Sequence, residues 1–83
     1  MKLNARQVDA AKPKEKAYKL ADGAGLYLEV VPSGSRYWRM KYRFNGKEKR
    51  MAFGVYPAVS LAQARALRDE AKKKLAEGID PSF

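Results

Sequence analysis

Residues 36–53 read RYWRMKYRFNGKEKRMAF and carry the clearest structural signal in the chain. Apolar and polar side chains alternate through residues 36–44, which is typical of a strand with one buried face and one exposed face. Asn45 and Gly46 come next, and this dipeptide favours a two-residue hairpin turn because both of its positions need a positive φ. The sequence therefore predicts a β-hairpin whose strands are residues 36–44 and 47–53.

The turns fix the register of a three-stranded meander. A two-residue turn places Met40 opposite Met51 and Trp38 opposite Phe53. A three-residue loop at residues 32–34 joins a preceding strand, residues 26–31, and pairs Leu28 with Trp38. One face is then apolar, with Leu26, Leu28, Val30, Trp38, Met40, Tyr42, Met51 and Phe53. The opposite face carries Tyr27, Glu29, Tyr37, Arg39, Lys41, Arg43, Glu48 and Arg50.

Two capping boxes predict the helices. Asn4 with Gln7 begins a short helix over residues 5–11, and Ser60 with Gln63 begins a long helix over residues 61–77. The long helix is the only large amphipathic element, so we expect it to cover the apolar face of the sheet. Residues 18–20 alternate and leave room for a short fourth strand at the edge, followed by a turn at residues 22–25.

The predicted fold class is therefore α+β: a three-stranded antiparallel sheet, with that short fourth edge strand as an option, packed on one face by a long C-terminal helix. A short N-terminal helix completes it. The 83 residues form one domain, with an ordered core over about residues 3–79. Residues 80–83 are expected to begin a linker.

Composition limits the chemistry. Cysteine and histidine are absent, which removes disulfides, thiolate nucleophiles and the commonest metal ligands and general bases. We therefore expect no catalytic residues, no metal and no cofactor, and no small-molecule substrate. No signal peptide and no membrane-spanning apolar run is visible, so we expect a cytoplasmic protein without a membrane partner.

Positive charge is concentrated in one segment. The formal net charge is +9. Residues 36–50 hold seven basic side chains and one acidic one: Arg36, Arg39, Lys41, Arg43, Lys47, Lys49 and Arg50 against Glu48. Such clustering favours a polyanionic partner.

The uncovered face of the sheet is the predicted DNA-binding surface, because β-ribbons enter the major groove of duplex DNA. Its candidate DNA-binding residues are Tyr27, Tyr37, Arg39, Lys41, Arg43 and Arg50. Arginine can reach guanine bases or phosphates, whereas lysine is better suited to phosphates. Two alternatives stay open: a protein-interaction module that organises protomers or accessory proteins, and an RNA-binding sheet. The second is weaker, because Trp38 and Tyr42 fall on the apolar face.

Several motifs together resemble the N-terminal domain of prophage and pathogenicity-island integrases, which are tyrosine recombinases. The motifs are YKLADGAGLYL (18–28), PSGS (32–35), WR (38–39), YR (42–43), GVYP (54–57), SLAQAR (60–65) and GIDP (78–81). Ala24 departs from the pattern, since many relatives have glycine there, and we expect this to affect only the turn. The resemblance implies a non-catalytic module that binds arm-type sites on double-stranded DNA. Core-binding and catalytic domains, absent from this chain, would follow it in an enzyme that integrates or excises a prophage or genomic island.

Overall fold

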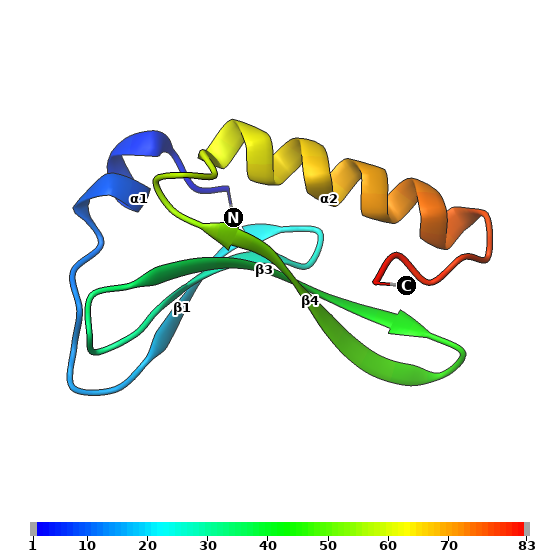
Figure 1. Ribbon diagram of the computed structural model, residues 1–83, viewed down its shortest axis with the longest axis horizontal. Helices are drawn as coiled ribbons and strands as arrows, with labels where there is room; N and C mark the ends of the chain where they lie inside the picture. Colours follow the sequence, from blue (N-terminus) through cyan, green and yellow to red (C-terminus); the bar gives the residue numbers. More distant parts are fainter. Residues whose placement is uncertain (1, 83) are drawn as a thin grey trace.

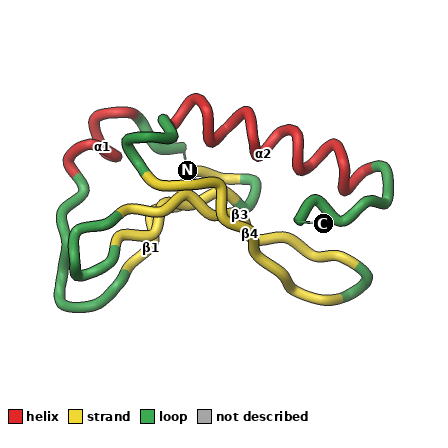
Figure 2. The backbone as a smooth tube through the Cα atoms, in the orientation of Figure 1, coloured by secondary structure: helices red, strands yellow, loops and turns green. Residues whose placement is uncertain are grey.

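A four-stranded antiparallel sheet carries two helices on one side in the computed structural model, which describes residues 2–82 (Figure 1). The elements, in order, are α1 (Ala5–Ala10), β1 (Tyr18–Gly23), β2 (Leu26–Val30), β3 (Arg36–Phe44), β4 (Lys47–Val55) and α2 (Leu61–Ala76). Strand order in the sheet is the order in the sequence, β1-β2-β3-β4, and α2 runs across one face (Figure 2). The predicted α+β class is confirmed, and the optional fourth strand is a full six-residue partner of β2.

Both capping boxes are present. The side chains of Asn4 and Ser60 accept from the backbone N–H of Gln7 and Gln63, and each glutamine accepts from the backbone of its capping residue. The helices end one residue earlier than predicted, at Ala10 and Ala76.

The predicted register is right over most of the sheet and wrong at one point. Leu28 faces Trp38, and Met40 faces Met51, as expected. Trp38, however, faces Gly54 instead of Phe53, because β4 contains a bulge there. Gly54 has a φ of +130°, and a Cβ on it would lie 2.6 Å from a methyl group of Val59. The chain therefore needs glycine opposite Trp38, whose indole N–H donates to the Val59 carbonyl at 2.8 Å.

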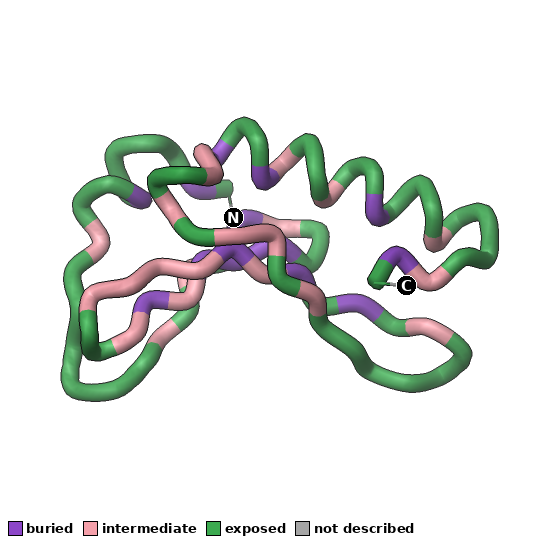
Figure 3. Tube along the Cα trace, in the orientation of Figure 1, coloured by how far each residue is buried: buried purple, intermediate pink, exposed green. Residues whose placement is uncertain are grey.

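The core lies between α2 and the inner face of the sheet, as the buried residues in Figure 3 show. Six of the eight residues predicted for this face are buried: Leu26, Leu28, Val30, Trp38, Met40 and Tyr42. Met51 and Phe53 are only half-buried. On α2, Leu61, Ala64 and Ala71 are buried, but Leu67 remains 41% exposed. The helix therefore covers the end of the sheet near its own N-terminus more completely than the hairpin end.

Asp22 is the centre of an ion-pair network that the sequence did not predict. The sequence predicts that Asp22 lies in a turn. In the structure Asp22 belongs to β1, is 2% exposed, and binds both arginines at 2.8–3.2 Å. The hydrogen bond from Arg65 holds the pKa of Asp22 below its usual range. The network ties β1 to α2, and the turn shrinks to Ala24 and Gly25.

Residues 80–82, expected to begin a linker, contact the β3–β4 hairpin. Tyr42 donates to Asp80 at 2.7 Å, Lys49 forms an ion pair with Asp80, and Pro81 is buried. The hydrogen bond from Lys49 lowers the pKa of Asp80. Phe83 lies outside the described residues.

Candidate nucleic-acid interface

The face of the sheet opposite α2, called the outer face here, is concave. Figure 1 shows the β3–β4 hairpin and the far ends of β1 and β2 bending away from the helix. The strand register assigns twelve side chains to this face: Lys19 and Ala21, Tyr27 and Glu29, Tyr37, Arg39, Lys41 and Arg43, and Glu48, Arg50, Ala52 and Val55. One row of directly paired residues takes one residue from each of the four strands: Ala21, Tyr27, Arg39 and Ala52.

Basic residues outnumber acidic ones on the outer face by five to two. The basic residues are Lys19, Arg39, Lys41, Arg43 and Arg50, and the acidic residues are Glu29 and Glu48. Among the described residues, no ion pair is formed by Lys19, Arg43 or Arg50. The outer face therefore keeps net positive charge that the fold itself does not neutralise.

Arg39 lies at the centre of this face and is held by its neighbours. Its Nε lies 2.8 Å from Glu29 Oε1, and its guanidinium carbon lies 5.6 Å from the centre of the Tyr37 ring. Nε makes no well-directed hydrogen bond within the described chain. The ion pair thus restrains Arg39 while its guanidinium keeps donors for an acceptor from outside the chain.

Lys41 faces Arg50 across β3 and β4, as the sequence predicted. Glu48 offsets the repulsion between these like charges, since its carboxylate lies 3.4 Å from Lys41 Nζ. Both side chains are more than half exposed, so this ion pair contributes little to stability and leaves Lys41 accessible to another anion.

Tyr27 is on the predicted face but is not exposed. Only 5% of the residue is accessible, and its hydroxyl is buried without a hydrogen-bond partner among the described residues. The ammonium of Lys19 lies 5.0 Å from the centre of its ring. Tyr37 is half-buried. Tyr27 therefore lies on the predicted face but is covered, because β1 extends the sheet and brings Lys19 over its ring.

Lys19 is the residue that the sequence analysis missed on this face. The alternation of Tyr18, Lys19 and Leu20 was visible, and it would have placed Lys19 outward if the edge strand had been included in the register. The other five candidates, Tyr37, Arg39, Lys41, Arg43 and Arg50, all lie with Tyr27 on the outer face.

Three basic residues of the charged segment have other positions. Arg36 donates to the carbonyls of Val8 and Asp9 and lies over the Tyr56 ring, so it fastens α1 to the sheet. Lys49 is engaged by Asp80. Lys47 pairs with Phe44 next to the turn and faces the same side as the core. Three of the seven basic residues in residues 36–50 therefore serve the fold or lie away from the outer face.

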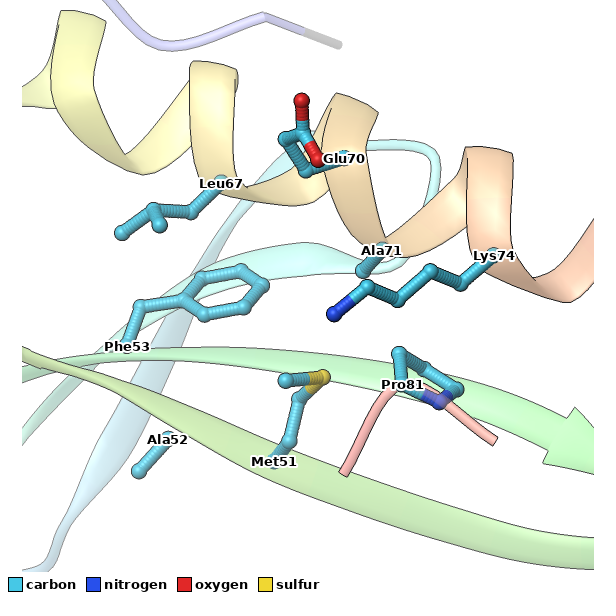
Figure 4. Close-up of a pocket in the computed structure, with 8 residues that line it drawn as sticks. All are labelled: Met51, Ala52, Phe53, Leu67, Glu70, Ala71, Lys74 and Pro81. Carbon is cyan, nitrogen blue, oxygen red and sulfur yellow. The ribbon is translucent and has the colours of Figure 1, made fainter. Parts of the chain in front are cut away.

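A groove lies on the other side of the molecule, between α2 and β4 (Figure 4). It encloses about 270 Å³ and is lined by Met51, Ala52, Phe53, Leu67, Glu70, Ala71, Lys74 and Pro81. Its floor is apolar, and Glu70 and Lys74 come from the helix above it. This groove explains why Leu67 is exposed: the helix and the hairpin diverge there.

No cluster of three or more acidic side chains suited to a metal ion occurs within residues 2–82. Neither described helix has the length and apolar character needed to cross a bilayer.

Comparison with known proteins identifies the family of this chain. Residues 3–83 match the model of a family described as an arm DNA-binding domain. The chain belongs to this family of DNA-binding domains.

The relatives are integrases. The chain is 71% identical over 83 residues to the integrase of Enterobacteria phage P4, which covers 98% of this chain and 19% of that protein. It is 48% identical over 79 residues to the prophage integrase IntS of Escherichia coli K12, covering 95% of this chain and 20% of that protein. The integrase of Shigella phage Sf6 matches over the same shares. The chain thus spans about a fifth of the length of these relatives, and it corresponds to their DNA-binding arm domain and not to their catalytic domain.

Proposed function

We propose that this domain binds specific arm-type sites on double-stranded DNA through its outer face, as the N-terminal module of an integrase that inserts or excises a prophage or genomic island. The main support for this proposal is the uncovered, concave face with five basic side chains, three of which form no ion pair in the described chain. A fold that needed this face only for stability would not leave these charges unbalanced.

The width of the sheet suits the major groove. Four strands about 4.8 Å apart place the two outermost strand axes about 14 Å from each other. The groove is about 12 Å wide, so the central strands β2 and β3 reach the bases while the edge strands lie near the phosphates. Arg39 on β3 is then the candidate for a bidentate contact to guanine, and Tyr37 packs beside it. Lys41 and Arg43 lie nearer the hairpin end of β3 than Arg39 does, and there they contact phosphates, as Arg50 does on β4. The ring of Tyr27 forms the floor between them.

Binding should depend strongly on salt. If these three side chains, Lys41, Arg43 and Arg50, reach phosphates, the logarithm of the affinity should fall with the logarithm of salt concentration with a slope of about −3. The test is a titration by fluorescence anisotropy with a duplex selected from a random pool, a scrambled duplex and an RNA duplex of equal length. We expect tightest binding to the selected DNA duplex. Equal affinity for all three, or a slope near zero, would contradict the proposal.

Contact with another protein is the second candidate function, and the groove between α2 and β4 favours it. Its lining includes Leu67 of α2, which is 41% exposed, whereas Leu61 is buried and Leu75 is half-buried on the same helix. Another integrase protomer or a DNA-bending accessory protein is the proposed partner. Leu67→Lys should abolish cooperative binding to a duplex with two sites and leave binding to a single site unchanged.

A further inference from the structure

The outer face contains a hollow at its β1 edge that the proposed function has not used. It encloses about 270 Å³ and is lined by Lys19, Ala21, Gly23, Gly25, Leu26, Tyr27 and Lys41. Its carbon surface comes from Ala21 and the Tyr27 ring, because Leu26 belongs to the buried inner face and the two glycines have no side chain. The two charged side chains that line the hollow are Lys19 and Lys41.

The hollow is built by close backbone packing. Gly25 has a φ of +89°, and a Cβ on it would collide with the carbonyl oxygen of Lys41. The Lys41 N–H donates to the Gly25 carbonyl at 2.9 Å. The turn after β1 is therefore held directly against β3, which fixes Lys41 as one side of the hollow while Lys19 on β1 forms the other.

Tyr27 supplies an independent sign that a ligand belongs here. Its side chain lines the hollow, yet its hydroxyl is buried with no hydrogen-bond partner in the described chain. Buried hydroxyl groups without partners are destabilising and uncommon. The Lys19 ammonium lies over the ring, where it has only the π face as a partner.

We propose that this hollow is a subsite for the DNA backbone, which takes one phosphate between Lys19 and Lys41 and the adjoining deoxyribose against Ala21 and the Tyr27 ring. The phosphate draws Lys19 off the ring, and an oxygen of the backbone accepts from the Tyr27 hydroxyl. A backbone ligand fits this position better than a base does, because β1 is an edge strand and lies at the wall of the groove. Arg50 on β4, the other edge, meets the opposite strand of the duplex. This inference rests on the proposed function and adds β1 to the DNA-binding surface.

Lys19→Ala tests the charge in this subsite, with Lys73→Ala on the opposite side of the sheet as the charge-matched control. The probe is a 20-base-pair duplex of mixed sequence. One lost phosphate contact should weaken binding about 8-fold at 0.1 M salt and reduce the salt slope by about 0.9. Lys73→Ala should change affinity less than 2-fold. If both variants behave alike, the inference is wrong.

Two uncharged substitutions test the shape and the hydroxyl. Ala21→Met fills the hollow without altering charge and should weaken binding at least 3-fold with an unchanged salt slope. Tyr27→Phe should weaken binding while the melting temperature stays equal or rises, since the free protein loses an unpartnered hydroxyl. Wild-type affinity in both variants would overturn the subsite.

Arg50→Ala separates this inference from the proposed function. If Arg50→Ala weakens binding and the β1 variants do not, the outer face binds DNA without β1. If neither edge matters, the outer face is not the DNA-binding surface, and both proposals fail.

Discussion

The two faces of the sheet are built from alternate residues of the same strands, yet their contacts are of opposite kinds. On β3, Trp38, Met40 and Tyr42 pack under α2 and are at least nine-tenths buried. Between them, Arg39 and Lys41 meet only neighbouring side chains of the sheet. The polar groups of the inner face have defined partners, as the indole of Trp38 has in Val59. Those of the outer face have weak partners or none within the described chain.

The contrast between the inner and outer faces separates the residues that stabilise this small domain from those available for recognition. The inner face gains from tight packing, so any lost volume there lowers the free energy of unfolding. The outer face keeps its charged donors accessible at the cost of mutual repulsion, which a polyanion relieves. Substitutions on the two faces should therefore change two different measured quantities.

Trp38→Ala should give the largest effect on stability. The side chain is fully buried and contacts the Tyr56 ring edge-on at 6.4 Å between ring centres. Its removal should lower the free energy of unfolding by about 3–5 kcal/mol. Urea unfolding followed by circular dichroism measures this. Trp38→Phe, which keeps most of the volume, should lose less. A stable Trp38→Ala variant with weakened DNA binding would mean that the two faces are reversed.

The tryptophan also reports on the wild-type protein, because it is the only one in the chain. Its emission should be that of a buried indole and should change little when DNA binds. A large change on DNA binding would contradict the separation of the two faces.

Among the substitutions that remove a buried contact, Asp22→Asn should give the second largest effect on stability. Breaking a fully buried ion pair costs about 3–5 kcal/mol, but water can still reach Arg65, so we expect about 2 kcal/mol. The pKa of Asp22 is lowered in the folded protein. Its contribution to the free energy of unfolding is therefore fully present above the unfolded pKa of about 3.9, and it is lost as pH falls through the folded pKa. Urea titrations at several pH values should show the gap between wild type and Asp22→Asn closing below about pH 4. A gap that persists at low pH would exclude the ion pair as its cause.

Local patterns predicted most of the architecture. Alternation in residues 36–44, the turn at Asn45 and Gly46, and the two capping boxes depend on neighbours in the sequence, and each was confirmed. What failed depends on distant contacts. The bulge opposite Trp38 is set by Val59 packing on Gly54, and Asp22 is buried because two arginines of α2 reach it. No pattern within β1 or β4 contains that information.

The candidate site shows the same division. The register placed all six candidates on one face, since alternation decides which way a strand residue points. Exposure was not decided by alternation: Tyr27 is covered because β1 adds Lys19 beside it. Which of these residues touch DNA is a prediction that the following substitutions test.

Arg39→Ala should have the largest effect on binding among the outer-face variants. Loss of a bidentate base contact should cost about 1.5 kcal/mol of binding to the selected duplex and less with scrambled DNA. Glu29→Gln is the matched control, because it removes the acidic partner of Arg39 and should strengthen binding to both duplexes. If Arg39→Ala lowers both affinities equally, Arg39 contacts phosphate and not a base.

Lys41→Ala should weaken binding to both duplexes to the same extent, about 1 kcal/mol, and reduce the salt slope by about one. Its melting temperature should stay close to that of the wild type, because its exposed ion pair with Glu48 contributes little. Anisotropy titrations at three salt concentrations measure both quantities. A loss confined to the selected duplex would assign Lys41 to base recognition.

The turn between β1 and β2 borders the outer face only through Gly25, and its other residue, Ala24, offers the smallest and most selective test. Ala24 has a φ of +53°, a conformation that glycine adopts without the cost imposed by a Cβ. Ala24→Gly should therefore raise the free energy of unfolding by about 0.5–1 kcal/mol. The gain is smaller than the full steric cost, because glycine also increases the conformational entropy of the unfolded chain.

The adjacent residue gives the opposite expectation. Gly25→Ala should be strongly destabilising, since its Cβ would meet the Lys41 carbonyl. If Ala24→Gly raises the melting temperature and leaves DNA affinity unchanged, the turn acts only through the fold. If it weakens DNA binding instead, the rigidity of this turn contributes to the outer face. The two faces would then share one structural element, and stability and recognition could not be separated there.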